Sequence, residues 1–214
     1  MNYIDTKLDA VSYTIPGIIA KLACNITQKK DYFSDSVISK ETLKFILKAE
    51  HTSILEHNSI TLLARGISRS LLAQITRERH FSFTSGSQHY QNYKDYPYIT
   101  GQSYKTMDES IKQSIKAYSK LIDADFPKEE ARQVLPNAMT VNLLFTANAR
   151  ALVHFLRTRL CKRNVKEMQI FAQKLLTECR IWWPELFDLI GPPCFMDRKC
   201  NQGKMSCGEK YEDI

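Results

Sequence analysis

Hydrophobic and polar positions change their period twice in the first third of the chain. Residues 39–51, SKETLKFILKAEH, carry apolar side chains at helical spacing behind Ser39, a residue type that caps helix N-termini, and they predict a short helix. Residues 58–67, NSITLLARGI, alternate apolar side chains with others. This period of two predicts a strand, and we expect Gly66 to end it.

A helix is predicted directly after this strand. In residues 68–79, SRSLLAQITRER, Leu71 and Ile75 stand four positions apart, which places them on one helical face. Gln74 and Arg77 stand three positions apart and therefore share a different face. The prediction thus carries the helix into the basic sequence at its C-terminal end.

The middle of the chain changes from loop to helix. Residues 81–104 are rich in Ser, Gly, Tyr and Gln and predict a long ordered loop, because their aromatic side chains are atypical of disorder. Residues 106–124 then repeat apolar side chains at helical spacing. Thr106 and Glu109 have the separation of a capping box, so we expect Thr106 to cap that helix.

Four further elements are predicted in the C-terminal part. Residues 127–136 predict a helix bounded by a proline at each end, and residues 138–147 predict a strand. Residues 148–160 predict a helix capped by Asn148, and residues 165–183 predict the longest helix. Because no repeat and no convincing linker interrupts these elements, they indicate one α+β domain.

Composition restricts the class of protein. The 214 residues are 43% hydrophobic and 25% charged, which is typical of soluble globular proteins. No apolar run approaches the roughly 18 to 20 residues that span a bilayer. The N-terminal MNYIDTKLDAVSY carries acidic residues and no apolar core, unlike a secretory signal. We therefore expect a cytoplasmic protein that does not enter a membrane.

The charge of the chain indicates the kind of partner. A formal net charge of +7 and a pI near 9.0 favour anionic partners, either nucleic acid or small phosphorylated molecules. The basic residues are spread, with local concentrations at 77–80 and 157–166, and do not form one long run. This distribution favours pockets over a nucleic-acid groove.

The six cysteines do not predict a metal site. Cys24, Cys161 and Cys179 lie in apolar or helical contexts, where a reduced core thiol is the usual explanation. The C-terminal tail holds three more thiols, those of Cys194, Cys200 and Cys207. Structural zinc normally takes four ligands, so three thiols fit it poorly and we predict no metal. The function of the tail stays open.

Common catalytic motifs do not occur in the chain. It lacks GxGxxG after a strand, GxxxxGK[ST] and GxSxG, so conventional dinucleotide and nucleoside-triphosphate folds are not indicated. His51 and His57 flank a glutamate without the HExxH spacing, and a pocket-lining or capping function is the simpler interpretation. His154 and Arg159 lie beside an apolar helical face. With no nucleophile pair visible, a cofactor is expected to carry the chemistry of any reaction.

Five segments in order resemble the flavin-dependent thymidylate synthases. They are HTSILEH (51–57), GISRSLLAQITRER (66–79), SFTSGSQHY (82–90), ARQVLP (131–136) and NARALVHFLRTR (148–159). The resemblance covers about residues 15 to 190 and implies a central, mostly antiparallel sheet flanked by a helical bundle. It also implies a catalytic domain over residues 1–192, followed by a cysteine-containing tail over residues 193–214.

The resemblance implies a reaction and its partners. A homotetramer would bind FAD where subunits meet, convert dUMP to dTMP with methylenetetrahydrofolate as carbon donor, and use NADPH as reductant. The family uses no protein nucleophile on the uracil, which agrees with the missing nucleophile pair.

Matching positions give the expected site. Arg159 would lie at the uracil ring and favour its ionised form, because a cation stabilises charge that develops on a pyrimidine carbonyl. Arginines and hydroxyl groups suit the phosphates of the nucleotide and the flavin. The nucleotide positions are Gln74, Arg77, Ser85, Ser87, His89, Arg132 and Arg159. The flavin positions are Ser53, Arg77, Glu78, Arg79, Ser85, Asn148, Arg150 and His154, with His51 near the face of flavin and folate.

The chain departs from the family pattern inside these segments. Glu78 replaces a histidine, His89 replaces an arginine, and Asn164 and Val165 replace an Ala-Gln pair, while Glu167 is kept. A carboxylate beside a flavin phosphate repels it unless the side chain turns away or pairs with a neighbouring arginine. His89 lacks the permanent charge and the fork of arginine, so we expect nucleotide binding to depend on pH.

Two alternatives remain beside the thymidylate synthase. The first is a flavin enzyme of the same fold that methylates or hydroxymethylates another pyrimidine nucleotide, as the altered contacts suggest. The second is a non-catalytic, basic RNA-binding descendant, which would suit the charge and the aromatic residues of 81–98. Against the second alternative, the chain has no RRM or KH pattern.

Overall fold

The computed structural model describes residues 6–28, 37–100 and 104–209. Its contacts divide the chain into two compact units. The first unit comprises Met1–Lys7, Leu63–Arg79 and Phe83–Phe145, and the second comprises Leu8–Leu62, His80–Ser82 and Thr146–Ile214. In chain order the elements, with η for 3-10 helices, are β1 (Lys7–Tyr13), α1 (Ile18–Thr27), α2 (Lys40–Lys48), η2 (Thr52–His57), β2 (Ser59–Ser68), α3 (Arg69–Ile75), β3 (Phe81–Ser85), α4 (Lys105–Asp123), α5 (Lys128–Ala131), η3 (Arg132–Val134), β4 (Thr140–Asn148), α6 (Ala149–Arg159), α7 (Lys166–Trp182), α8 (Pro184–Phe187), α9 (Pro193–Met196) and η4 (Gly203–Met205).

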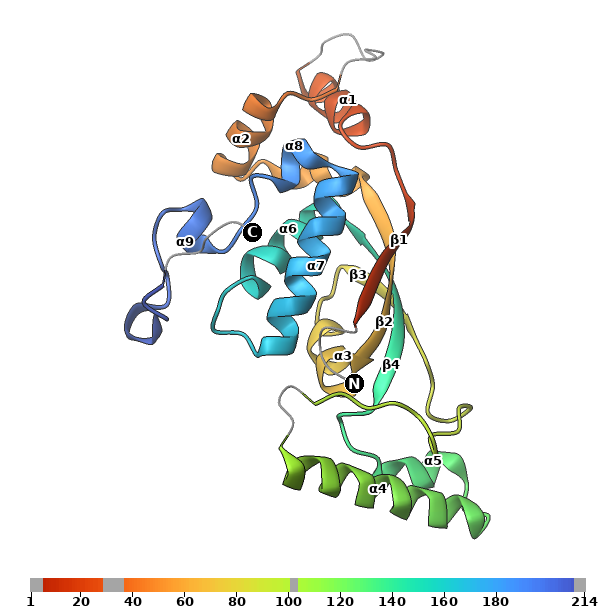
Figure 1. Cartoon of the computed structure of the whole chain (residues 1–214). Coiled ribbons are helices and arrows are strands. Elements are labelled where there is room, and N and C mark those ends of the chain that lie inside the picture. The colour runs from red at the N-terminus through yellow and green to blue at the C-terminus, as the bar shows by residue number, and fades with distance from the viewer. Residues whose placement is uncertain (1–5, 29–36, 101–103, 210–214) are drawn as a thin grey trace. The chain divides into compact units, whose positions relative to one another are not determined.

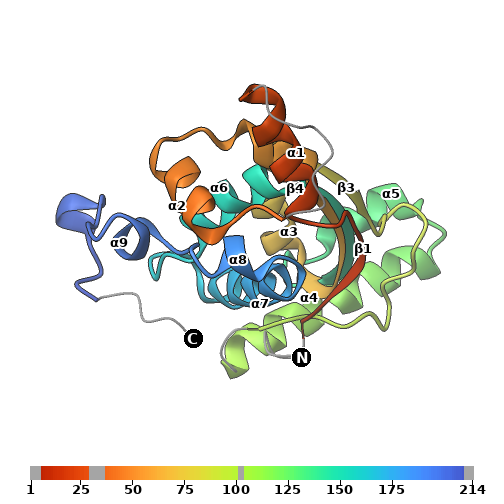
Figure 2. The ribbon, with the colours of Figure 1, turned by 90° about the horizontal axis from the view of Figure 1, so that it is seen from above.

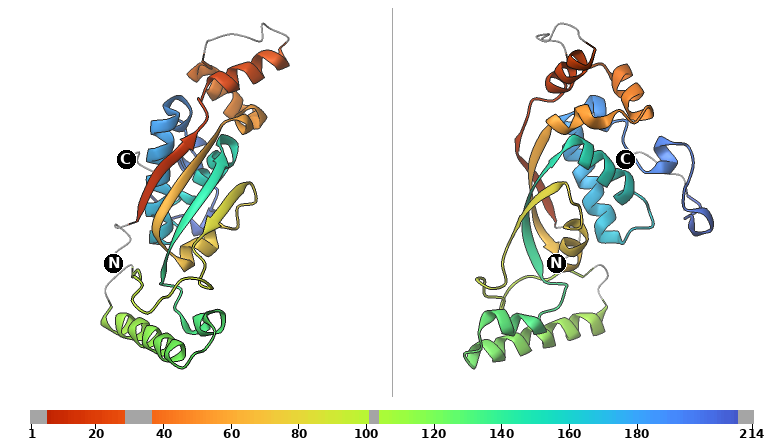
Figure 3. Two further views of the ribbon diagram at one scale, coloured as in Figure 1. Left: turned by 90° about the vertical axis from the view of Figure 1, so that its right-hand side faces the viewer. Right: turned by 180° about the vertical axis from the view of Figure 1, so that it is seen from behind.

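One sheet has the strand order β1-β2-β4-β3, which can be followed in Figure 1 and in the left view of Figure 3. The hydroxyls of Thr61 and Thr146 share a hydrogen bond of 2.9 Å. Further along, the Gly66 amide donates to Asn142 Oδ1 at 3.1 Å. Because position rises on β2 as it falls on β4, the two strands are antiparallel. The predicted α+β fold with a mostly antiparallel sheet is confirmed.

The sequence predicted that β2 ends at Gly66, and this prediction is wrong. The strand runs on to Ser68, and Gly66 lies within it at φ +69°. That backbone conformation is open to glycine at little cost. Both polar groups of Gly66 are bonded, because its carbonyl accepts the Thr6 hydroxyl at 3.2 Å while its amide bonds Asn142. At Gly66, side chains from the neighbouring segments therefore satisfy the backbone groups of β2.

Residues 81–104 are not a loop throughout, because Phe81–Ser85 form β3. The remaining described part of the segment is an ordered loop, as predicted. Tyr93 in this loop is fully buried, and its amide bonds Tyr118 Oη of α4 at 3.4 Å. The adjacent helices α4 and α5 contact each other in the first unit.

Three further expectations about helices are wrong. Tyr104 occupies the N-cap of α4 and no side chain caps it, so Thr106 forms no capping box. The helix α4, with 19 residues, is longer than α7, with 17. The predicted helix over 127–136 divides into α5 and the 3-10 turn η3. The edge strand β1 and helix α1 escaped prediction, since β1 exposes all but one of its residues and lacks a buried alternation.

The second unit packs its helices around aromatic side chains. The Phe155 ring of α6 lies 5.6 Å from that of Phe81 and 6.3 Å from that of Phe171 of α7, centroid to centroid. Helix α7 contacts α8, which in turn contacts α2 (Figure 2). At the end of α7, Trp182 Nε1 donates to the Thr14 carbonyl at 2.9 Å.

Within the described residues no helix is long and apolar enough to cross a membrane. The division into a domain over 1–192 and a tail over 193–214 stays a prediction.

We expect Leu175→Ala to lower the free energy of unfolding by about 2–5 kcal/mol, because this fully buried side chain of α7 would leave a cavity. Ile181→Ala is the matched control, since Ile181 lies on the same helix and is 73% exposed. Urea unfolding measures both. Equal losses in the two variants would show that α7 is not packed as described.

Candidate functional site

Helix α6 starts where β4 ends, and this junction places three predicted residues. Asn148 Oδ1 accepts the Ala151 amide at 2.8 Å, which confirms the predicted N-cap. From this start, Arg150 and His154 reach the exposed side of α6. Arg150 forms an ion pair with Glu56 of η2. The pair joins α6 to the HTSILEH segment, so two of the quoted segments adjoin in the second unit.

The predicted residues of η2 are accessible. His51 is the residue before this 3-10 helix and Ser53 lies within it, and both are exposed. The His51 ring lies 6.5 Å from that of Phe45, centroid to centroid. They belong to the segment to which Arg150 is joined through Glu56, and exposed polar and basic groups of this kind suit an anionic or polar ligand.

Arg159 is the last residue of α6 and is half-buried. Its guanidinium carbon lies 5.8 Å from the centre of the Phe155 ring, close enough for a cation–π contact. A cation at a helix C-terminus is also stabilised by the helix dipole. The guanidinium of Arg159, which the sequence predicted to bind uracil, therefore lies beside the ring of a core aromatic residue.

Asn164 fixes the turn that follows Arg159. Its Nδ2 group donates to the carbonyls of Thr158, Arg159 and Cys161 at 3.0, 3.2 and 3.0 Å. Gln169 of α7 adds a bond from Nε2 to the Asn164 carbonyl at 2.6 Å. These bonds satisfy carbonyls that the end of a helix leaves without partners. Sequence reasoning identified Asn164 only as a departure from the family pattern.

The basic turn after α3 holds three predicted residues of the first unit. Helix α3 ends at Ile75, so Arg77 lies in the turn that follows it. The prediction that Gln74 and Arg77 share a helical face is therefore wrong. Arg77 and Arg79 are exposed, whereas Glu78 between them is half-buried. The two cations are thus accessible to an anionic ligand.

His89 and Arg132 meet around one acidic residue. His89 Nδ1 lies 3.5 Å from Glu129 Oε2, and Arg132 Nε donates to the Glu129 carbonyl at 3.1 Å. Ser87 Oγ accepts the His89 amide at 3.2 Å. The structure therefore brings three predicted nucleotide residues together with Glu129, which sequence reasoning missed. Ser85, also predicted, ends β3 nearby in sequence and is exposed.

Arg69 is a second residue that sequence reasoning missed. Its Nη2 donates to the Gly86 carbonyl at 2.7 Å and to Tyr93 Oη at 3.0 Å. Tyr93 Oη in turn donates to Gln91 Oε1 at 2.8 Å. This chain of bonds holds the backbone between Ser85 and Ser87. Its signal in the sequence was an arginine within the quoted segment GISRSLLAQITRER.

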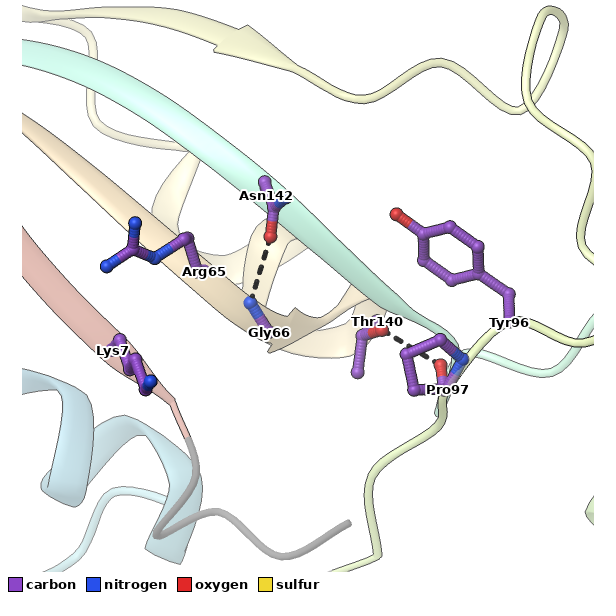
Figure 4. Close-up of a pocket in the computed structure, with 7 residues that line it drawn as sticks. All are labelled: Lys7, Arg65, Gly66, Tyr96, Pro97, Thr140 and Asn142. Atoms are coloured by element: carbon purple, nitrogen blue, oxygen red, sulfur yellow. Dashed lines mark hydrogen bonds between the residues drawn. The ribbon is translucent and has the colours of Figure 1, made fainter.

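A separate hollow of about 440 Å³ lies on the first unit (Figure 4). It presents the cations Lys7 and Arg65 from neighbouring strands, with Tyr96 across from them. Burial, and then the nearby Tyr93, raise the pKa of Tyr96, while Arg69 opposes them. The phenol thus stays protonated and can donate to a ligand. These lining residues differ from those that the sequence predicted, because loop and strands from separate segments form the hollow: Lys7, Arg65, Gly66, Tyr96, Pro97, Thr140 and Asn142.

Comparisons with known proteins agree with the sequence motifs. A family model described as thymidylate synthase complementing protein matches residues 10–185. A flavin-dependent thymidylate synthase of Clostridium tetani is 33% identical over 193 residues, covering 79% of this chain and 77% of the relative. One of Geobacter sulfurreducens is 33% identical over 176 residues, covering 78% and 75%.

Solved structures show the same fold. A thymidylate synthase X of Helicobacter pylori, with FAD and dUMP, has a TM-score of 0.74 at 21% identity, covering 86% of this chain and 97% of that one. A UMP/dUMP methylase of Streptomyces cacaoi, bound with 5-Br dUMP, has a TM-score of 0.76 at 20% identity, covering 86% and 94%. At these identities the likeness concerns the fold alone.

We expect Asn164→Ala to lower the free energy of unfolding by about 1–3 kcal/mol, because three carbonyls lose a donor. Asn164→Asp keeps the shape but supplies acceptors only and places negative charge at a helix C-terminus, so it should cost more. Chemical unfolding of the three proteins gives the order. An aspartate variant as stable as the unmodified protein would contradict donation from this side chain.

Proposed function

Because the chain belongs to the thymidylate synthase complementing protein family, we propose that it methylates dUMP to dTMP with FAD as its bound cofactor. The observation that carries the proposal is the family match over residues 10–185, which contains all five motif segments. We extend the proposal to methylenetetrahydrofolate as carbon donor and NADPH as reductant. A cytoplasmic location belongs to the same proposal.

The residues present fit an anionic nucleotide and a flavin dinucleotide. In the first unit Arg77, Arg79 and Arg132 are exposed cations. The same unit holds the hydroxyls of Ser85 and Ser87. In the second unit Arg150 and His154 are exposed on α6. Such groups bind phosphate oxygens by charge-assisted hydrogen bonds. We also propose a homotetramer. It is supported by the exposure of these groups within one chain, which leaves room for a further subunit to complete the site.

Bound FAD would supply the reducing electrons for making the new methyl group. In the proposed reaction Arg159 binds a uracil carbonyl and stabilises the negative charge that develops when the ring is activated. The carbon at position 5 of the ring then accepts the one-carbon unit of the folate. No protein nucleophile is required. Arg159, half-buried beside Phe155, would act by holding its positive charge at a fixed place.

His89 and Arg132 would bind the nucleotide phosphate. The Glu129 carboxylate lies 3.5 Å from His89 Nδ1, whereas Arg132 bonds the Glu129 backbone carbonyl. The carboxylate therefore competes with the phosphate for His89. When the phosphate binds, His89 has to exchange one anion for another.

A second candidate function is methylation of another pyrimidine nucleotide by the same fold. The observation that favours it is the replacement of arginine by His89 in the predicted phosphate loop, with Glu129 at 3.5 Å. Turnover with dUMP, UMP and dCMP, with products identified by mass, separates the two functions. The proposed function requires dTMP as the principal product.

We expect the purified protein to be yellow and to turn over dUMP, and Arg159→Ala to lower kcat by about 10²–10³-fold while FAD stays bound. Arg157→Ala is the matched control on the same helix, and its turnover should stay within about 2-fold of the unmodified enzyme, as for a surface ion pair. A colourless protein that does not bind added FAD would instead favour the non-catalytic descendant. Full turnover in Arg159→Ala would remove the proposed function of this residue.

We expect Glu129→Gln to tighten dUMP binding several-fold, because its carboxylate, 3.5 Å from His89 Nδ1, no longer competes with the phosphate for His89. His89→Arg should tighten binding as well, since arginine adds a permanent charge and a fork of donors. Binding measurements on the unmodified protein and both variants at one pH and one salt concentration give the order. An unchanged affinity in both variants would contradict the assignment of His89 to the phosphate.

A further inference from the structure

Four cysteines from two separate segments of the chain line one small cavity of the second unit. They are Cys161, Cys194, Cys200 and Cys207, and the cavity has a volume of about 20 Å³. The two remaining cysteines, Cys24 and Cys179, are not part of its lining. The cavity has room for one ion or one water molecule and is too small for a nucleotide or another organic ligand.

The cavity brings together the turn after α6 and the C-terminal tail. Cys161 lies in that turn, two positions after Arg159, and Cys194 lies in α9. Cys200 and Cys207 stand on either side of η4. Sequence reasoning counted three tail thiols and rejected a metal because zinc takes four ligands. The fold supplies the fourth thiol from a segment more than thirty positions earlier.

The backbone turns tightly at η4, between Cys200 and Cys207. Gly203 has φ +53° and Gly208, directly after Cys207, has φ +74°, conformations that glycine adopts without strain. The Ser206 hydroxyl and the Gln202 backbone amide bond the Cys200 sulfur. These turns let both cysteines reach the lining of the same cavity.

Charged residues at the cavity match an anionic sulfur cluster. Arg163 donates to Gln202 Oε1 and lies 3.6 Å from Met205 Sδ, so it already joins the turn to the tail. Lys162 pairs with Glu209 at the other side of the lining. Four thiolates around a divalent ion give a net charge of about −2, which nearby cations offset.

We propose that Cys161, Cys194, Cys200 and Cys207 bind a single Zn²⁺ ion that fastens the C-terminal tail to the turn between α6 and α7. Four sulfur ligands in a closed tetrahedron are typical of a structural zinc site. On binding, each thiol gives up its proton and forms one Zn–S bond, with no change of oxidation state. The site is independent of the proposed reaction on dUMP.

The sulfurs have to move inward for this. Among the described residues, no three histidine, cysteine or acidic side chains yet stand at metal-binding distance from one another. Since Zn–S bonds are about 2.3 Å long, the tail must close on the cavity when the ion binds. The separations between successive tail cysteines also exceed the usual two to four intervening residues, so a sequence motif does not reveal the site.

The test uses the full-length protein, purified in reducing buffer without added metal. Mass spectrometry of the elements should find about one zinc and little iron per chain. After the metal is stripped with a chelator, adding Zn²⁺ should protect about four thiols per chain from a thiol reagent. Co²⁺ in place of Zn²⁺ should give the intense absorption bands of tetrahedral thiolate coordination.

Variants assign the ligands. Cys200→Ser and Cys207→Ser should lose most of the bound zinc, whereas Cys24→Ser, in α1 and outside the cavity, should keep it. If a serine variant does not fold, the thiol protection of the stripped unmodified protein still decides. The proposal is overturned by unchanged thiol reactivity on adding Zn²⁺, by iron in place of zinc, by disulfides among these cysteines in the reducing buffer, or by equal zinc loss in Cys24→Ser.

Discussion

The pairing of β2 with β4 is the interaction on which the placement of the functional residues depends. The last residue of each strand is also the cap of the helix that follows it. Ser68 accepts the Leu71 amide at 2.9 Å at the start of α3, and Asn148 accepts the Ala151 amide at 2.8 Å at the start of α6. Because strand and helix share a residue, the register of the sheet determines where each helix begins. The candidate site residues on each helix, such as Gln74 on α3 and Arg159 on α6, then follow at fixed intervals from its cap.

Elements with a strong local signal were predictable from the sequence. Ser39 and Asn148 cap the helices that their residue types indicated, since capping depends on a side chain and amides only three positions away. β3 and the path of β2 through Gly66 were not predictable, because both depend on β4. Gly86 bonds Asn142 of β4 through its amide at 3.2 Å, and Gly66 bonds the side chain of the same residue. A pairing between segments more than fifty positions apart leaves little trace in either one.

The candidate site divides in the same way. Motif order indicated residues such as His89, Arg132 and Arg159, and the structure adds what surrounds them. Neither Glu129 nor Arg69 was identified as a site residue from the sequence. Glu129 is an acid in the short charged helix α5, and Arg69 is the first residue of α3, inside a quoted segment. Their importance comes from bonds to groups that the chain brings close only on folding, such as Glu129 with His89 and Arg69 with the Gly86 carbonyl.

The bond from Trp182 to the Thr14 carbonyl joins two residues that are 168 positions apart. Closing so long a loop costs entropy that local contacts do not recover, so this part of the second unit forms late. A ribosome adds roughly 5–20 residues per second, and Thr14 therefore waits for roughly ten seconds or more before its partner exists. Until then the Thr14 carbonyl has no indole N–H from which to accept. The contact between this N-terminal segment and α7 therefore forms only once most of the chain has been synthesised.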